Sequence, residues 1–209
     1  MQTVSRRVAH LLLKAKAVQL NTARPFTWAS GIRSPIYCDN RKILSFVKIR
    51  NQIKSFLAEK SREFGKAELI AGVATAGIPH GTLLADSLEL PFVYVRSKAK
   101  AHGLQSKIEG TFEEGMKTLV VEDLISTGKS SLEAVQSLRS EGLEVMGVAA
   151  IFTYQLEVAE QNFKQAKCPY FTLSDYSTLV DVALEEEYIT ADEVALLRLW
   201  REQPENWNP

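Results

Sequence analysis

Two adjacent carboxylates followed by a turn of small residues form the most chemically suggestive pattern in this chain. Residues 119–131 read LVVEDLISTGKSS. We expect Glu122 and Asp123 to stand where a buried strand stops, and the turn after them to open a helix. Backbone amides in such a turn attract a phosphate, while carboxylates accept hydrogen bonds from hydroxyls or bind a metal that the ligand carries. The pattern therefore predicts a site for a sugar phosphate.

Two other interpretations of this stretch are open. Gly128, Lys129 and Ser130 match the end of a P-loop, in which four residues separate a first glycine from the Gly-Lys pair. Asp123 occupies that first glycine position, where the backbone would have to wrap a polyphosphate. The other interpretation is an ordinary strand-to-helix turn with a Ser or Thr cap, which leaves the acidic pair unexplained.

Composition restricts the classes of protein. The 209 residues suffice for one α/β domain with an appendage, and the fractions of 45% hydrophobic and 24% charged residues are typical of a soluble protein. Lys+Arg and Asp+Glu are both 25, which argues against nucleic-acid binding through a broad basic face. No apolar run is long enough for a membrane span and no signal-peptide pattern is present, so we expect a cytoplasmic protein without a membrane partner. Two lone cysteines suit a reducing compartment.

The chain is expected to form a single domain in three parts. Residues 1–65 carry amphipathic helices at 4–20 and 45–64, with an extended, turn-rich segment at 25–39. Residues 66–152 alternate strands at 68–73, 91–95, 117–121 and 145–152 with helices at 78–88 and 130–141. Residues 153–209 carry a helix at 155–166, a strand at 170–173, a helix from 175 and a last helix opened by a Thr190–Glu193 capping box. The alternation predicts a mainly parallel sheet flanked by helices.

Three loops should meet at one edge of that sheet, because each follows the carboxyl end of a parallel strand. Ligands bind beyond these ends in such sheets. The three loops follow Val73, Val95 and Val121. The first loop is rich in small residues that admit an anion, although a tight strand-to-helix turn is the better explanation of this loop taken alone, and His80 is expected to pack or cap. The second loop is long and cationic, as expected of a lid over an anion or of a solvated loop.

Three separated motifs resemble one known family. Residues 26–39, FTWASGIRSPIYCD, resemble the segment that orotate phosphoribosyltransferases place over the pyrimidine. Residues 94–103, YVRSKAKAHG, resemble the mobile catalytic loop of that family, and residues 122–128, EDLISTG, resemble its ribose-phosphate motif. The likeness runs along essentially the whole chain. The sequence is thus similar to the orotate phosphoribosyltransferases, which are type I phosphoribosyltransferases.

The resemblance implies a fold and a reaction. The fold would be a type I phosphoribosyltransferase core, α/β with a mainly parallel sheet, and a small hood built from the N-terminal segment. The reaction would convert orotate and phosphoribosyl diphosphate to orotidine monophosphate and diphosphate. Mg²⁺ would arrive with the diphosphate, so no residue is assigned as a certain metal ligand. The protein would be a homodimer in which the loop of one subunit completes the site of the other.

The same resemblance assigns roles to residues. The catalytic residues would be Lys100, His102 and Asp123. Phosphoribosyl diphosphate would contact Arg96, Lys98, Lys100, His102, Glu122, Asp123, Leu124, Ile125, Ser126, Thr127, Gly128, Lys129 and Ser130. Orotate would contact Ser126, Phe26 and Arg33. Tyr154 stands where some members carry a basic residue that grips the pyrimidine, so recognition of the orotate carboxylate would fall to Arg33 or to backbone groups.

Two alternatives come from other classes of protein. One is a phosphoribosyltransferase that salvages purines or other bases, against which residues 26–39 argue. The other is a non-catalytic regulator that senses phosphoribosyl diphosphate and binds nucleic acid. The zero net charge gives the regulator little support, and the pairing of Lys100 with His102 in the loop favours catalysis.

Overall fold

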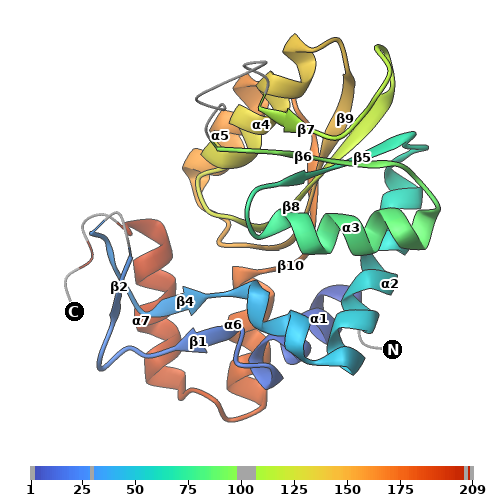
Figure 1. Ribbon diagram of the computed structural model, residues 1–209. Helices are drawn as coiled ribbons and strands as arrows, with labels where there is room; N and C mark the ends of the chain where they lie inside the picture. The colour runs from blue at the N-terminus through green and yellow to red at the C-terminus, as the bar shows by residue number, and fades with distance from the viewer. Residues whose placement is uncertain (1–2, 29–30, 98–106, 205–206, 208–209) are drawn as a thin grey trace.

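A six-stranded sheet forms the centre of the molecule (Figure 1). The computed structural model describes residues 3–28, 31–97, 107–204 and 207. The sheet has the order β10-β9-β8-β5-β6-β7, and only β7 pairs in an antiparallel manner. Its strands are β5 (Leu69–Val73), β6 (Phe92–Val95), β7 (Ile108–Glu109), β8 (Lys117–Ile125), β9 (Glu144–Thr153) and β10 (Tyr170–Asp175). The prediction of a mainly parallel sheet is confirmed.

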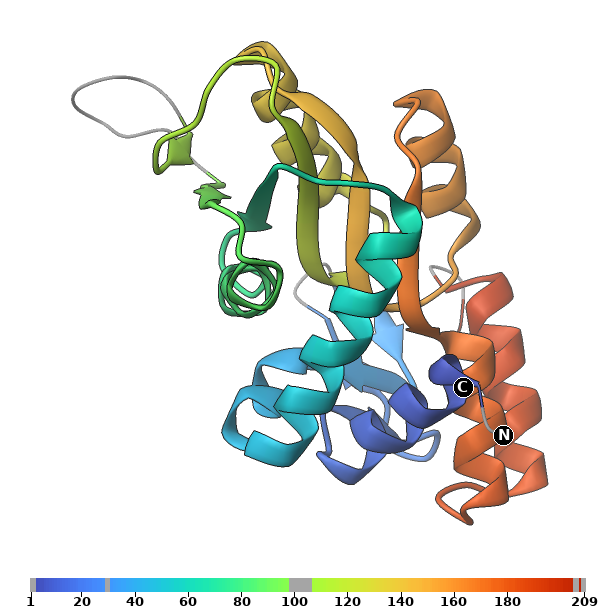
Figure 2. The same ribbon diagram turned by 90° about the vertical axis from the view of Figure 1, so that its right-hand side faces the viewer.

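Helices cover both faces of the sheet, and each face has its own apolar core. Helices α1 (Val4–Lys14), α2 (Val47–Phe64) and α3 (Gly77–Leu88) lie on one side, and α4 (Lys129–Ser140) and α5 (Glu157–Gln165) on the other. Figure 2 shows the sheet between these layers. Successive residues of β8 alternate between the two cores: Leu119 and Val121 join the first, and Val120 joins the second. A strand that is buried on both faces has a continuous run of apolar residues, so its position is readily predicted from the sequence.

Segments from both halves of the chain meet in a further part, which we call the hood and whose buried residues belong to the first core. It contains the strand pairs β1 (Val18–Leu20) with β4 (Ile36–Cys38) and β2 (Phe26–Thr27) with β3 (Arg33–Ser34), together with α6 (Tyr176–Glu185) and α7 (Ala191–Glu202). In Figures 1 and 2 these elements gather at one end of the central sheet. Trp200, which is fully buried, contacts the rings of Trp28, Tyr154 and Tyr176. These rings join segments that lie more than a hundred residues apart.

The first expected helix, at 4–20, is too long. Helix α1 ends at Lys14, Lys16 takes a left-handed conformation with φ 51°, and Val18 then begins β1. Val18 fits the helical spacing of the apolar residues, but its pairing with Cys38 on β4 decides its conformation. The second expected helix starts at Val47, after a 3-10 helix, η1 (Asn40–Ser45).

The expectation that a strand stops before the acidic pair is also wrong. Strand β8 continues through Glu122 and Asp123 to Ile125, because β9 pairs with it as far as Ile125 and Thr153. Strand β7 was not expected. The capping box is confirmed, since Thr190 and Glu193 exchange hydrogen bonds at the start of α7.

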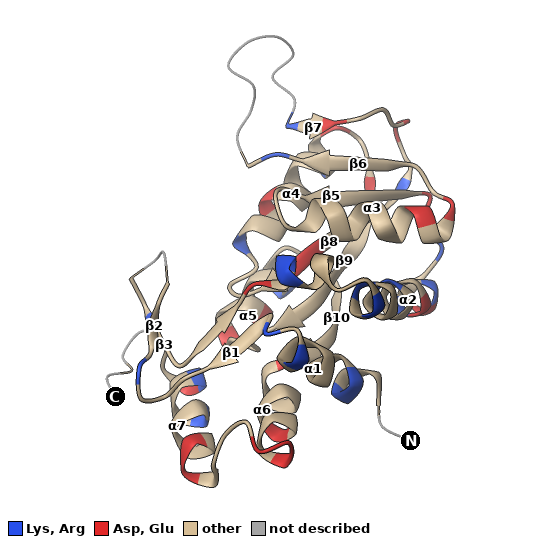
Figure 3. Cartoon of the chain, turned by 60° about the horizontal axis from the view of Figure 1, so that its bottom comes forward, with Lys and Arg blue, Asp and Glu red and all other residues tan. Residues whose placement is uncertain are grey.

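Charges of both signs are interspersed on the surface. In Figure 3, Lys and Arg share helices α2 and α7 with Asp and Glu. Throughout residues 3–28, 31–97, 107–204 and 207, each helix is too short or too polar to span a bilayer.

Candidate active site

Glu122 is buried beneath the turn that follows β8. Its side chain is 5% exposed, and its Oε2 accepts hydrogen bonds from the hydroxyls of Ser130 (3.2 Å) and Ser131 (3.4 Å) at the start of α4. Burial, together with the negative charge of Asp123, raises the pKa of Glu122 to about 8. Glu122 is therefore largely protonated at neutral pH, and it ties the strand to the helix.

Asp123 is the second carboxyl group of the pair. Burial raises its pKa, while a hydrogen bond from Glu122 and the nearby guanidinium of Arg41 favour its ionised form. Its main-chain oxygen accepts a hydrogen bond of 2.7 Å from the side-chain amide of Asn40. Two carboxyl groups in one buried place share a proton, so the pair holds about one charge at neutral pH.

The turn after β8 is shaped to leave the start of α4 accessible. Gly128 has φ 77°, and a Cβ there would lie 2.6 Å from the ring of Phe163. The amide of Asn162 holds the carbonyl of Thr127 at 3.0 Å. Within the described residues, no side chain caps α4 and its first turn has no acidic residue. Free amides at the positive end of a helix suit a phosphate.

The three expected loops leave the same edge of the sheet, because β5 pairs in parallel with both β6 and β8. Ala74 from the loop after β5 and Arg96 and Ser97 from the loop after β6 line one cleft together with Ser130 from the first turn of α4. Arg96 is held there, because its Nη1 lies 3.2 Å from Oε1 of Glu109 on β7. Lys98, Lys100 and His102, to which the sequence assigns the diphosphate, lie outside the described residues.

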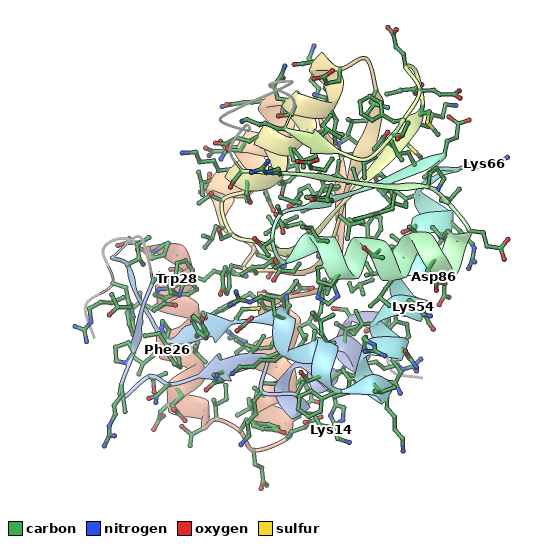
Figure 4. All side chains as sticks on the ribbon, in the orientation of Figure 1. Lys14, Phe26, Trp28, Lys54, Lys66 and Asp86 are labelled. Carbon is green, nitrogen blue, oxygen red and sulfur yellow. The ribbon has the colours of Figure 1, made fainter. Side chains whose placement is uncertain are left out.

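The segment expected to cover the base reaches the sheet through Trp28. Phe26 and Arg33 belong to the β2–β3 hairpin, and the Phe26 ring lies 5.6 Å from that of Tyr37. The Trp28 ring stacks on Tyr154 at 4.9 Å between centroids, and Figure 4 shows Phe26 and Trp28 at the same end of the molecule.

Tyr154 connects Trp28 to strand β8. Its main-chain N–H donates to the carbonyl of Ile125, the last residue of β8, at 3.1 Å. The half-buried Ser126 follows directly. The hood is thereby attached at the point where the base is expected to bind.

The sequence interpretation missed three residues beside Asp123. Asp39, Asn40 and Arg41 lie at the start of η1; Asp39 caps it and bonds Nε of Arg41 at 2.6 Å. Their signal in the sequence is weak: a short polar run after an extended segment, with nothing to pair position 40 with position 123. His80, in contrast, packs as expected, with 2% of its surface exposed.

Comparison with known proteins agrees with this geometry. Residues 41–187 match the family model described as the phosphoribosyl transferase domain. The chain belongs to the phosphoribosyltransferase family.

Individual relatives of the chain show to which group within this family it belongs. A Bacteroides thetaiotaomicron protein named orotate phosphoribosyltransferase is 52% identical over 100% of this chain and 99% of its own length. An Enterococcus faecalis protein of the same name is 53% identical over 99% of both chains. The crystal structure of orotate phosphoribosyltransferase from Aeropyrum pernix superposes with a TM-score of 0.76 at 27% identity, covering 88% of this chain and 99% of that one. Within the family, the chain falls among the orotate phosphoribosyltransferases.

Proposed function

We infer that the protein transfers ribose 5-phosphate from 5-phosphoribosyl 1-diphosphate to orotate, giving orotidine 5′-monophosphate and diphosphate in de novo pyrimidine biosynthesis. One observation carries this inference: a buried acidic pair at the end of β8 leads directly into the accessible N-terminus of α4. That arrangement offers acceptors for sugar hydroxyls and donors for a phosphate, the two kinds of group that a ribose 5-phosphate carries. The identity of 52% to a protein named for this reaction supports it.

The two carboxyl groups have different tasks in this proposal. Asp123 carries the negative charge, accepts hydrogen bonds from the ribose hydroxyls and stabilises the positive character that develops on the ring as diphosphate leaves. Glu122 is buried and bonded to the two serines of the turn. Glu122 would therefore contact the ribose as a protonated carboxyl group. Its hydrogen bonds to Ser130 and Ser131 also fix the start of α4, where the phosphate would bind.

The turn binds the 5′-phosphate. Residues 124–130 would surround it, and the backbone amides at the start of α4, which no side chain caps within the described residues, would donate to it. The hydroxyls of Ser126, Thr127 and Ser130 and the ammonium of Lys129 add donors. Thr127, Lys129 and Ser130 are all exposed, so a phosphate can reach them.

The cationic loop binds the leaving diphosphate. Arg96 already lines the cleft beside Ser130, which supports its assignment. Lys98, Lys100 and His102 complete the loop, with Lys100 and His102 as catalytic residues, because cations and a proton donor stabilise charge that builds on the leaving group. Closure of the loop would exclude water that hydrolyses the activated sugar. In a homodimer, the loop of one subunit would serve the site of the other.

Orotate would lie near Ser126, beneath the segment that contains Phe26 and Arg33. The attachment of this segment through Trp28 and Tyr154 supports the placement. Arg41 offers a further cation for the orotate carboxylate. Its side chain is 59% exposed, and its positive charge is close enough to Asp123 to lower the pKa of that carboxyl group.

Magnesium would enter with the diphosphate. Among the described residues, no group of three or more His, Cys, Asp or Glu side chains is placed to hold a metal ion. The oxygen atoms of diphosphate are preferred ligands for Mg²⁺. When bound, the ion would offset the negative charge of the leaving diphosphate. The residues present fit an ion carried by the substrate, and we propose a cytoplasmic location for the reaction.

The deciding experiment follows the orotate absorbance after the protein is mixed with Mg²⁺ and phosphoribosyl diphosphate. We expect orotate to be consumed, and we expect Lys100→Ala to reduce the rate by about a hundredfold or more. Lys66→Ala is the matched control, because Lys66 precedes β5 and so lies at the opposite end of the strands (Figure 4).

Each outcome is informative. A folded wild-type protein that leaves orotate untouched would overturn the proposed reaction, and purine bases would be tested next. Orotate consumption that survives Lys100→Ala would keep the reaction but remove the role of Lys100.

A further inference from the structure

Asn40 is a polar residue with no exposed surface, placed against the catalytic strand. It begins η1, directly after the segment expected to cover the base. Its Nδ2 donates to the main-chain oxygen of Asp123 at 2.7 Å, across 83 positions of sequence. A buried amide is costly unless it is hydrogen-bonded, so this contact holds both residues in place.

The contact replaces a missing strand partner. Strand β5 pairs with β8 only up to Gly72 and Val121, so Asp123 lies beyond the end of that ladder. On the other side, β9 pairs with Glu122 and with Leu124. The side chain of Asn40 thus supplies a hydrogen bond that a neighbouring strand would otherwise provide, at the residue whose carboxylate faces the ribose.

His80 supports Asn40 from α3. Its imidazole is 2% exposed and lies beside the main chain of Asn40, which partly opposes the effect of burial on the pKa of His80. Within the described residues, Nε2 of His80 and Oδ1 of Asn40 have no hydrogen-bond partner. Burial lowers the pKa of His80 to about 4, so the ring is neutral at physiological pH. The hydrogen bond between η1 and β8 therefore has the buried, neutral imidazole of α3 beside it.

We propose that Asn40 is a positioning residue for the reaction: its amide sets the direction of the Asp123 carboxylate and couples the base-covering segment to the ribose site. The inference rests on the proposed function. It differs from a purely structural role because the bond reaches the main chain of the one residue that carries the charge. Misdirection of that carboxylate by a fraction of an ångström would weaken stabilisation of the transition state more than it weakens ground-state binding.

The test is the separation of kcat from KM in Asn40→Ala. We expect kcat for orotate consumption to fall by about tenfold to a hundredfold, while KM for phosphoribosyl diphosphate changes by less than about threefold. Ile43→Val is the matched control: Ile43 lies in the same element and is also fully buried, but it belongs to the apolar core. The control should keep its kcat.

A second pair of variants protects the test if Asn40→Ala fails to fold. His80→Asn keeps a polar side chain beside Asn40, and His80→Leu replaces it with an apolar one at similar volume. We expect His80→Leu to lower kcat more than His80→Asn does. Equal kcat values in this pair, or a folded Asn40→Ala with the kcat of wild type or of Ile43→Val, would overturn the inference.

Calorimetric titration with Mg²⁺ and phosphoribosyl diphosphate, without orotate, keeps the two proposals apart. Binding by wild type with unaltered kcat in Asn40→Ala overturns the role of Asn40 alone. Absence of binding and of orotate consumption in folded wild type overturns the proposed function itself.

Discussion

The sheet edge and the hood are built in opposite ways. At the sheet edge, the groups that would hold ribose and phosphate come from one run of residues, 122–131, within a strand, a turn and a helix. In the hood, each important contact joins distant parts of the chain: Trp28 packs on Tyr154 and Trp200, and Nε1 of Trp200 donates to the carbonyl of Arg33 at 3.1 Å. The difference suggests that the sheet edge carries the chemistry and the hood carries the placement of the base.

Removal of Trp200 should produce the largest effect on stability. Trp200→Ala empties a fully buried site between three aromatic rings, so we expect a loss of about 3–5 kcal/mol in the free energy of unfolding. Denaturant unfolding measures it. The control is Leu199→Ala on the same helix, where the side chain is 54% exposed and the loss should be below about 0.5 kcal/mol. Similar losses in both variants would show that the aromatic cluster does not hold the hood.

At the sheet edge, the largest effect should fall on activity. Asp123→Asn removes the charge beside the ribose at nearly constant shape, and we expect kcat/KM to fall by about a hundredfold to a thousandfold. Steady-state kinetics of orotate consumption measures it, with Asp86→Asn on the exposed side of α3 as the control (Figure 4). A kcat/KM close to that of wild type would remove Asp123 from the mechanism.

Glu122 and His80 should contribute opposite pH dependences to the free energy of unfolding. The pKa of Glu122 is raised from 4.5 to about 8, so the folded state holds a proton that the unfolded state releases, and stability falls as pH rises through this range. The pKa of His80 is lowered from 6.5 to about 4, so stability falls as pH drops through that range. The two slopes oppose each other between 4.5 and 6.5, which leaves a net fall from 6.5 to 8.

Glu122→Gln should abolish that fall. It keeps the shape of the protonated side chain, and we expect it to be more stable than wild type above pH 8 by on the order of 5 kcal/mol, which is the shift from 4.5 to about 8 converted at about 1.4 kcal/mol per pKa unit. Chemical denaturation at pH 6, 7, 8 and 9 checks this expectation. A wild-type stability that stays level across these values would contradict the buried, protonated Glu122.

The parts of the fold that the sequence predicts are those made by local contacts. The strand-turn-helix around Gly128 and the capping box of Thr190 and Glu193 follow from neighbouring residues, and both were expected. The strand at Val18 was not, because its helical spacing conceals a pairing with Cys38. The extension of β8 through two carboxylates depends on β9, which lies about twenty residues further along the chain.

The candidate site divides in the same manner. The acidic pair and the phosphate turn were predicted because their residue types and spacing imply the chemistry. Asn40 was missed because a buried amide carries no periodic signal, and its partner lies 83 positions away. Polar contacts of this kind depend on the tertiary structure, because no local sequence pattern indicates which distant residues they join.

The hydrogen bond from Trp200 to the carbonyl of Arg33 has a consequence for synthesis of the chain. A chain emerges from the ribosome with its N-terminus first, so β2 and β3 leave long before α7, their partner, exists. The central sheet, whose last strand ends at Asp175, can close earlier. The hood is therefore completed after the central sheet, and until then its aromatic side chains remain exposed to other molecules.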